Sequence, residues 1–267
     1  MRILVCVKQV PDTAEIKIDP VTNTLIRAGV PSIVNPFDAC ALEVAARIKD
    51  ADPSTEITLL SMGPDQAKDA LRECLAVGGD KAYLCSDRKF GGSDTLATSY
   101  ILASAIQSIE EKEGKFDLIL AGKQAIDGDT AQVGPQIAEH LGIPVISYAE
   151  GIEVDGDSVI VKRQYEDRHH MLKAKMPVLI TALSELNEPR YMTPGGIFDA
   201  CDAEITTWGR ANLVDVEDGD LGLKGSPTKI AKASDKVRKG AGEKVAPDSP
   251  DEAVDYIMDK LLTKHVI

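Results

Sequence analysis

The chain has 267 residues and a formal net charge of -13; 43% of its residues are hydrophobic, but only 4% are aromatic. This length suits one large domain, or one domain with an extension. An acidic surface repels nucleic-acid phosphates and anionic lipids, so neither nucleic acid nor a membrane is an expected partner. A core built mainly of Val, Ile, Leu and Ala favours helices packed on a parallel sheet.

Short apolar runs alternate with helical patterns through the first 186 residues. The expected strands are residues 3–7, 56–62, 81–85, 116–121, 144–147 and 177–182. The expected helices are residues 39–49, 65–77, 95–113 and 130–141, the last of which ends at Gly142, a typical C-cap. This alternation predicts an α/β fold with a doubly wound, mostly parallel sheet. Residues 15–26 and 152–162 are expected to form antiparallel hairpins at a sheet edge.

The sequence changes character after residue 186. It becomes rich in Pro, Gly and Asp, and residues 224–244 are basic and polar. Only residues 250–264 again show the spacing of an amphipathic helix. A segment of this composition cannot bury a core by itself. We therefore expect an α/β domain at residues 1–186 and, at residues 187–267, a C-terminal arm whose terminal helix packs on a partner.

The five cysteines form no C-x-x-C pair and show no spacing typical of a zinc or iron–sulfur site. We expect them to be free, buried thiols in a reducing cytosol. The first apolar run is short and ends at a lysine, so it predicts a strand rather than a signal peptide, and no apolar run is long enough to span a membrane. The expected location is therefore the cytoplasm. The cysteines are Cys6, Cys40, Cys74, Cys85 and Cys201.

Motifs that would place chemistry on the chain's own side chains are missing from the sequence. Neither G-x-S-x-G nor H-E-x-x-H occurs. The neighbours His169 and His170 would point to opposite faces of a strand, which favours a solvated edge strand over a metal site. We expect neither a metal site nor a catalytic side chain.

Ligands of open α/β sheets bind beyond the carboxyl ends of the strands. One candidate loop, residues 122–134, follows an expected strand and contains Gly122 and Gly128, which permit tight turns. Its aspartates and its threonine could cap the next helix, whose free N–H groups and partial positive charge suit a diphosphate. Its glutamines could bond a ribose or a base. The same residues could equally form a capped loop without a ligand.

A second candidate loop follows the expected strand at residues 81–85. Its pair Gly91 and Gly92 frees the backbone, and the residues after the pair can cap the next helix. This is another possible anion-binding helix start, although the signal is weak by itself. Before these loops, Gly63 and Pro64 form a tight turn at the same edge. Asn35 or Asp38 could hydrogen-bond a purine or a ribose, and a plain N-cap is equally consistent.

Four motifs stand in order along the chain. They are residues 5–12 (VCVKQVPD), 35–38 (NPFD), 61–64 (SMGP) and 122–130 (GKQAIDGDT). Together they resemble the beta subunit of electron-transferring flavoproteins. The resemblance covers residues 1 to 182 well and the tail loosely.

The resemblance implies a heterodimer with an alpha subunit that carries its own FAD, and a nucleotide site on this chain. In simple members that site holds AMP; in electron-bifurcating members it holds a second FAD, which exchanges hydride with NADH. The glycine pair at residues 91–92 and the segment 127–134 are similar to the bifurcating type. The expected cofactor-binding residues are Cys6, Asn35, Pro36, Phe37, Asp38, Met62, Gly63, Gly91, Gly92, Ser93, Asp94, Thr95, Gln124, Ala125, Ile126, Asp127, Gly128, Asp129, Thr130, Ala131, Gln132, Val133 and Gly134.

The resemblance therefore implies FAD with NAD(H) as the electron donor or acceptor. Electrons would pass to the alpha-subunit FAD, to a partner flavin dehydrogenase of the acyl-CoA or lactate type, and to ferredoxin or flavodoxin. The chain would be enzymatic only as part of such a complex, because the cofactor supplies the redox chemistry and the protein supplies orientation and access.

Two alternatives remain open at this stage. The first is a simple electron-transfer subunit with structural AMP in place of FAD. The second is an adenine-nucleotide-binding protein of the universal-stress type, which would bind ATP on the same kind of sheet and carry no flavin. The long C-terminal arm counts against the second alternative.

Overall fold

The computed structural model describes residues 1–12, 31–228 and 240–267. The chain divides into two compact units, Met1–Ala231 and Lys232–Ile267. The hairpin expected at residues 15–26 lies outside the described residues. Flanking that segment, two short strands that the sequence did not predict, β2 (Gln9–Pro11) and β3 (Ser32–Val34), pair antiparallel.

A nine-stranded sheet organises the described part of the first unit, in the order β11-β5-β4-β1-β6-β10-β7-β8-β9. Pairing is parallel from β11 to β7, and β8 and β9 add antiparallel strands at one edge. The predicted doubly wound, mostly parallel sheet is confirmed, and so is the edge hairpin around Gly156. The strands are β1 (Arg2–Cys6), β4 (Glu56–Met62), β5 (Lys81–Cys85), β6 (Leu118–Gly122), β7 (Val145–Asp155), β8 (Ser158–Gln164), β9 (His169–Lys175), β10 (Val178–Ala182) and β11 (Ile205–Trp208).

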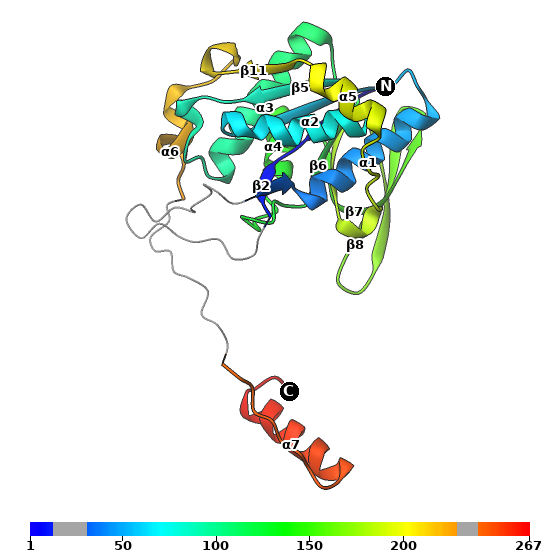
Figure 1. Ribbon diagram of the computed structural model, residues 1–267, viewed down its shortest axis with the longest axis vertical. Helices are drawn as coiled ribbons and strands as arrows, with labels where there is room; N and C mark the ends of the chain where they lie inside the picture. Colours follow the sequence, from blue (N-terminus) through cyan, green and yellow to red (C-terminus); the bar gives the residue numbers. More distant parts are fainter. Residues whose placement is uncertain (13–30, 229–239) are drawn as a thin grey trace. The chain divides into compact units, whose positions relative to one another are not determined.

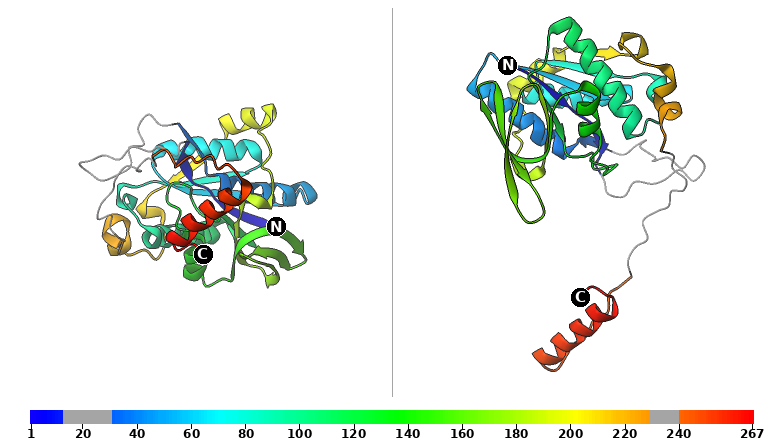
Figure 2. Two further views of the ribbon diagram at one scale, coloured as in Figure 1. Left: turned by 90° about the horizontal axis from the view of Figure 1, so that it is seen from below. Right: turned by 180° about the vertical axis from the view of Figure 1, so that it is seen from behind.

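Helices cover both faces of this sheet (Figures 1 and 2). On one face lie α1 (Pro36–Ala51), α2 (Lys68–Val77) and α5 (Pro194–Asp202), and on the other lie α3 (Thr95–Glu113) and α4 (Val133–Leu141). A short helix, α6 (Gly222–Gly225), contacts α3. This layering is typical of a sheet whose strands are apolar on both faces.

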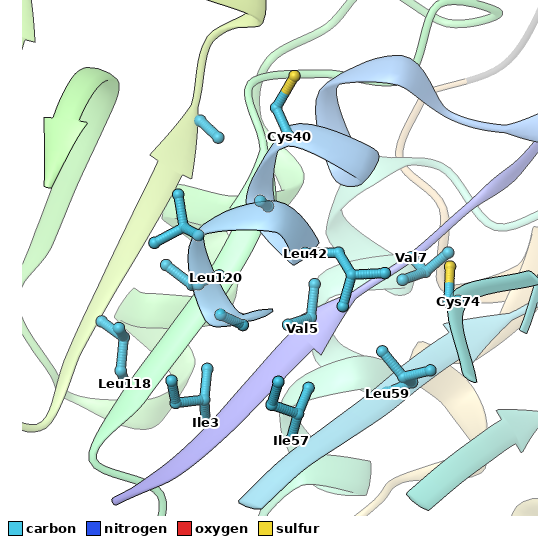
Figure 3. Packing of buried hydrophobic residues seen from close by; sticks show 14 of the residues in the cluster. Ile3, Val5, Val7, Cys40, Leu42, Ile57, Leu59, Cys74, Leu118 and Leu120 are labelled. Atoms are coloured by element: carbon cyan, nitrogen blue, oxygen red, sulfur yellow. The ribbon is translucent and has the colours of Figure 1, made fainter. Parts of the chain in front are cut away.

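The central strands bury alternate side chains in two separate cores. Figure 3 shows the first core, in which the strand side chains point towards Leu42 of α1. Leu4 lies between Ile3 and Val5 in β1, and its side chain is buried with Leu60 in the opposite core. The labelled strand residues of Figure 3 are Ile3, Val5, Ile57, Leu59, Leu118 and Leu120.

The compact first unit extends well beyond residue 186, where the sequence suggested a boundary. β11 pairs in parallel with β5 and so extends the sheet. Further along the chain, Leu213, Val216 and Leu221 are buried against the α3 face. Their apolar side chains are isolated among Asp and Gly, so no periodicity marked them in the sequence.

The second unit contains α7 (Pro250–Thr263), the amphipathic helix that the sequence predicted. Ser249 caps it, since its side chain accepts the N–H of Glu252 at 3.3 Å. Val254, Ile257 and Leu262 are exposed. That α7 packs on a partner subunit stays a prediction.

Candidate functional site

The strand order reverses between β1 and β6. From β1 the chain first builds outwards through β4 and β5, and then β6 adds on the opposite side of β1. Ligands of doubly wound sheets bind beyond the carboxyl ends of the strands at such a switch point. A cavity of about 780 Å³ lies there, a volume typical of small-molecule and cofactor sites.

Most residues of the predicted site line this cavity. Pro36, Phe37 and Ile126 do not. The predicted residues that do are Cys6, Asn35, Asp38, Met62, Gly63, Gly91, Gly92, Ser93, Asp94, Thr95, Gln124, Ala125, Asp127, Gly128, Asp129, Thr130, Ala131, Gln132, Val133 and Gly134. The structure therefore brings together loops that lie up to 130 residues apart in the sequence.

The start of α4 differs from the sequence prediction. The helix was expected from Thr130, but it begins at Val133, because Asp129 and Ala131 have φ angles of 51° and 53°, which an α-helix does not allow. None of the expected capping residues caps it. Gln132 takes the N-cap position without a side-chain hydrogen bond to the helix. Val133 and Gly134 line the cavity at the start of α4, and because no side chain caps the helix, their N–H groups can donate to an anion.

Side-chain contacts shape the loop before α4. Lys8 Nζ lies 2.5 Å from Asp127 Oδ1, and only 3% of the Asp127 side chain is exposed. Gln124 Nε2 donates to Asp129 Oδ1 at 2.8 Å. Asp127, Asp129 and Gln124, which the sequence suggested as nucleotide contacts or caps, thus hold the loop in shape.

Asn35 also binds this loop. It precedes α1 but makes no capping hydrogen bond. Its Nδ2 donates to the carbonyl of Gln124 at 2.8 Å, and its Oδ1 accepts the N–H of Ile126 at 3.2 Å. The side chain therefore fixes residues 124–126 instead of capping the helix.

Asp38 joins the carboxyl ends of β1 and β6, where the two strands diverge. Its Oδ1 accepts the N–H of Gly122 at 2.9 Å and its Oδ2 accepts the N–H of Lys8 at 2.8 Å. Only 7% of Asp38 is exposed. Burial raises the pKa of its carboxyl to about 7, although the hydrogen bonds from Lys8, Asn35 and Gly122 oppose that rise.

This raised pKa predicts a pH dependence of stability. Between about pH 4 and about pH 7 the folded chain keeps a proton on Asp38 that the unfolded chain has lost. The contribution of this proton to the free energy of unfolding is full below the unfolded-state pKa of Asp38 and is lost as pH rises through about 7. The free energy of unfolding of the wild type and of Asp38→Asn can be measured with urea at several pH values. The difference, wild type minus variant, should decrease between about pH 5 and about pH 8. A difference that does not change with pH would contradict the prediction.

The opposite wall of the cavity is the turn of residues 91–94. α3 begins at Thr95, as predicted, and Asp94 caps it by accepting the N–H groups of Leu96 at 3.0 Å and Ala97 at 3.1 Å. The expected cap is confirmed. A carboxylate therefore already occupies this helix start and repels an anion there, unlike at α4. Across the cavity mouth, Thr95 Oγ1 donates to Gln132 Oε1 at 2.9 Å.

With the geometry established, comparison with known proteins assigns the family. Residues 22–218 match the family described as the Electron transfer flavoprotein domain. The chain belongs to the beta subunits of the electron transfer flavoprotein family.

Curated relatives match over the whole length of the chain. The electron transfer flavoprotein subunit beta of Megasphaera elsdenii is 56% identical and that of Clostridium acetobutylicum 54% identical, each with 100% of both chains covered. The caffeyl-CoA reductase-Etf complex subunit CarD of Acetobacterium woodii is 51% identical, also over 100% of both chains. The resemblance inferred from the four motifs is thereby confirmed.

The cysteines of this flavoprotein subunit are all free, but they are not all buried. Cys40, Cys74 and Cys85 are buried, as predicted; Cys201 is exposed, contrary to the prediction, because α5 lies at the surface. Cys6 lines the cavity. Burial, reinforced by the charge of Asp38, raises the pKa of its thiol to about 12, so it offers the site a neutral thiol.

Several residues of the cavity wall escaped the sequence prediction. Those on β2 and β3 belong to strands too short for a period-two signal, and those on α3 and α4 resemble ordinary core residues. Lys8 could have been found from its position inside the first motif. The main examples are Lys8, Gln9, Pro11, Ser32, Thr98, Leu102 and Ile137.

The described ranges contain no helix that is both long and apolar enough to cross a membrane. Within the same ranges, His, Cys, Asp and Glu side chains form no cluster that could hold a metal ion. His169 and His170 are exposed on β9, at the edge of the sheet. A cytoplasmic location stays a prediction.

Proposed function

We propose that this chain is the nucleotide-binding subunit of an electron-bifurcating flavoprotein complex and that its cavity binds FAD. The observation that carries the proposal is the uncapped first turn of α4, which faces a cavity at the switch point of the sheet. Such a helix start places backbone N–H groups and a partial positive charge where a diphosphate can bind.

Local groups must hold an anionic cofactor here, because the chain as a whole is strongly acidic. Lys8 and Lys123 line the cavity beside the loop of residues 122–134, and Arg88 lines its other wall. Lys8 is paired with Asp127. Backbone N–H groups therefore supply most of the proposed diphosphate site, with Lys123 as a nearby positive charge.

The second nucleotide, NAD(H), would bind on the wall formed by residues 91–94. Because Asp94 caps α3, the N–H groups at that helix start are already bonded. The N–H of Gly91 donates to the carbonyl of Arg88, so the backbone N–H of Gly92, together with the Arg88 side chain, would be the better place for its phosphates. Opposite walls of one cavity would thus hold the two nucleotides against each other.

FAD would supply the redox chemistry: it would take hydride from NADH and pass electrons to the FAD of an alpha subunit, to a partner flavin dehydrogenase, and to ferredoxin or flavodoxin. The chain's own residues would bind, orient and limit access. The full-length similarity to a subunit of a caffeyl-CoA reductase-Etf complex supports assembly with partner subunits.

Cofactor content tests the proposal. The complex of this chain with its partner subunit is purified and extracted, and FAD and AMP are counted. Two FAD and no AMP per heterodimer support the proposal. One FAD and one AMP would overturn the placement of FAD here and favour the simple electron-transfer subunit.

Gly128→Phe tests the location of the site. A Cβ at Gly128 would meet no atom within 4 Å, and Gly128 lines the cavity, so the fold tolerates the ring while the ring fills the site. FAD content should fall below about one tenth of the wild-type value. Gly195→Phe is the matched control, because Gly195 is exposed, equally open and away from the cavity. Unchanged FAD in Gly128→Phe would show that FAD binds elsewhere.

A further inference from the structure

Residues 217–228, called the strap below, lie against the outer side of the turn at residues 91–94. The strap includes α6, which is seen at the same edge of the first unit as β11 (Figure 1). None of its residues lines the cavity, and the turn lies between the strap and the cavity. The strap can therefore influence the cavity only indirectly, and the turn is the part of the cavity wall to which it is hydrogen-bonded.

Ser226 makes the central contact. Its Oγ accepts the N–H of Asp94 at 2.8 Å and can donate to the carbonyl of Gly222 at 2.7 Å or of Gly92 at 3.3 Å. Only 4% of Ser226 is exposed. One buried hydroxyl thus fixes a donor of the turn, and its single proton is shared between a carbonyl of the strap and a carbonyl of the turn.

Backbone groups of the strap add two more hydrogen bonds to the turn. Leu223 N–H donates to the carbonyl of Gly91 at 3.0 Å, and Thr228 N–H donates to Asp94 Oδ2 at 3.0 Å. Asp94 therefore caps α3 with one carboxylate oxygen and binds the strap with the other. The contact is also close, because a Cβ at Gly222 would lie 2.3 Å from the carbonyl of Lys89.

Two ion pairs hold the beginning of the strap. Asp218 lies 2.6 Å from both Lys89 Nζ and Arg210 Nε. The N–H of Arg210 in turn donates to Asp87 Oδ2 at 2.9 Å, so the whole loop before α3 is attached to this part of the chain. The pairs are partly exposed, so the buried contacts of Ser226 are expected to dominate.

We propose that the strap sets the conformation of the turn at residues 91–94, and that Ser226 is the positioning residue through which it determines how tightly this wall binds its nucleotide. The inference rests on the proposed function, in which that nucleotide is NAD(H). The turn contains two glycines, whose backbone has many accessible conformations, and the buried hydroxyl of Ser226 acts with the other strap contacts to select one of them, so removing the hydroxyl loosens the turn.

The test compares Ser226→Ala with Ser108→Ala in the full chain carrying its flavin. Ser108 is the matched control: it is equally buried, and its Oγ accepts the N–H of Val214 at 3.0 Å, joining the same C-terminal region to α3 but away from the cavity. Calorimetric titration with NAD⁺ should show a dissociation constant about tenfold higher for Ser226→Ala, from the loss of about one hydrogen bond. Ser108→Ala should bind NAD⁺ as the wild type does. FAD content should stay unchanged in both.

Equal NAD⁺ affinity in Ser226→Ala and the wild type would overturn the inference, as would equal weakening in both variants. A wild-type chain that retains FAD but does not bind NAD⁺ would overturn both the inference and the placement of NAD(H). Amide hydrogen exchange of the wild-type chain, with and without NAD⁺, tests the inference even if Ser226→Ala does not fold. NAD⁺ should slow amide exchange in the strap, although the strap does not line the cavity, and unchanged exchange there would also overturn the inference.

Discussion

Asp38→Ala is expected to lower the free energy of unfolding by about 2–4 kcal/mol. The substitution removes both acceptors at the divergence of β1 and β6. The N–H of Gly122 is buried and would be left without a partner, whereas that of Lys8 is only partly buried. An unsatisfied buried donor costs about 1–3 kcal/mol, and the second loss adds less because water can reach it.

Asp38→Ala should lower FAD content by more than the loss of stability alone would cause. Asp38 fixes Gly122, the first residue of the loop that leads to α4, so FAD content should fall together with stability. Urea denaturation and flavin extraction measure the two effects. Asp69→Ala is a suitable control, because Asp69 is exposed on α2. This variant should differ from the wild type by less than about 0.5 kcal/mol in its free energy of unfolding. Wild-type stability in Asp38→Ala would refute the role assigned to this carboxylate.

Gly122→Ala is expected to destabilise the chain by about 3 kcal/mol, a cost typical of overpacking. A Cβ at Gly122 would lie 2.4 Å from Asp38 Oδ1 and 2.6 Å from Phe37 Cβ. It would also lie 2.8 Å from the backbone carbonyl carbon of Phe37, which cannot move without shifting α1. The glycine is needed for this close approach of β6 to α1.

Gly128→Ala provides the matched comparison within the same loop. A Cβ at Gly128 would meet no atom within 4 Å. The free energy of unfolding of Gly128→Ala should therefore stay within about 0.5 kcal/mol of the wild-type value. Thermal and urea unfolding of Gly122→Ala and Gly128→Ala are compared. The comparison shows whether the loop rejects a methyl group only at the crowded position or at any glycine. If both variants were equally destabilised, the steric explanation for Gly122 would fail.

The central strands could be predicted because their apolar runs reflect burial on both faces. α3 was placed at its observed bounds, since Asp94 and the apolar run after it are strong local signals. α4 was misplaced by three residues, because its loop adopts left-handed conformations at non-glycine residues. The part of the loop just before them is held by contacts with Lys8 and Asn35, which are distant in the sequence.

For the site, the sequence identified the loops but not what their side chains do. Asn35 does not cap α1, and both Asn35 and Asp38 hold the loop and the strand ends; that they also contact a ligand stays a prediction. The strap could not be predicted at all. Its apolar residues are isolated, and its hydrogen bonds to the turn at residues 91–94 span more than 130 positions.

The sequence by itself thus determined the central strands of the sheet, its main helices, the family and most of the loops that line the cavity, because strand periodicity, glycine turns and short motifs are local properties of the chain. Only the tertiary structure decided which helix start is free to accept an anion. α3 is capped by Asp94, whereas the left-handed residues before α4 leave its first N–H groups open to the cavity. Which backbone donors remain unpaired depends on contacts between distant segments, and no local pattern encodes those contacts.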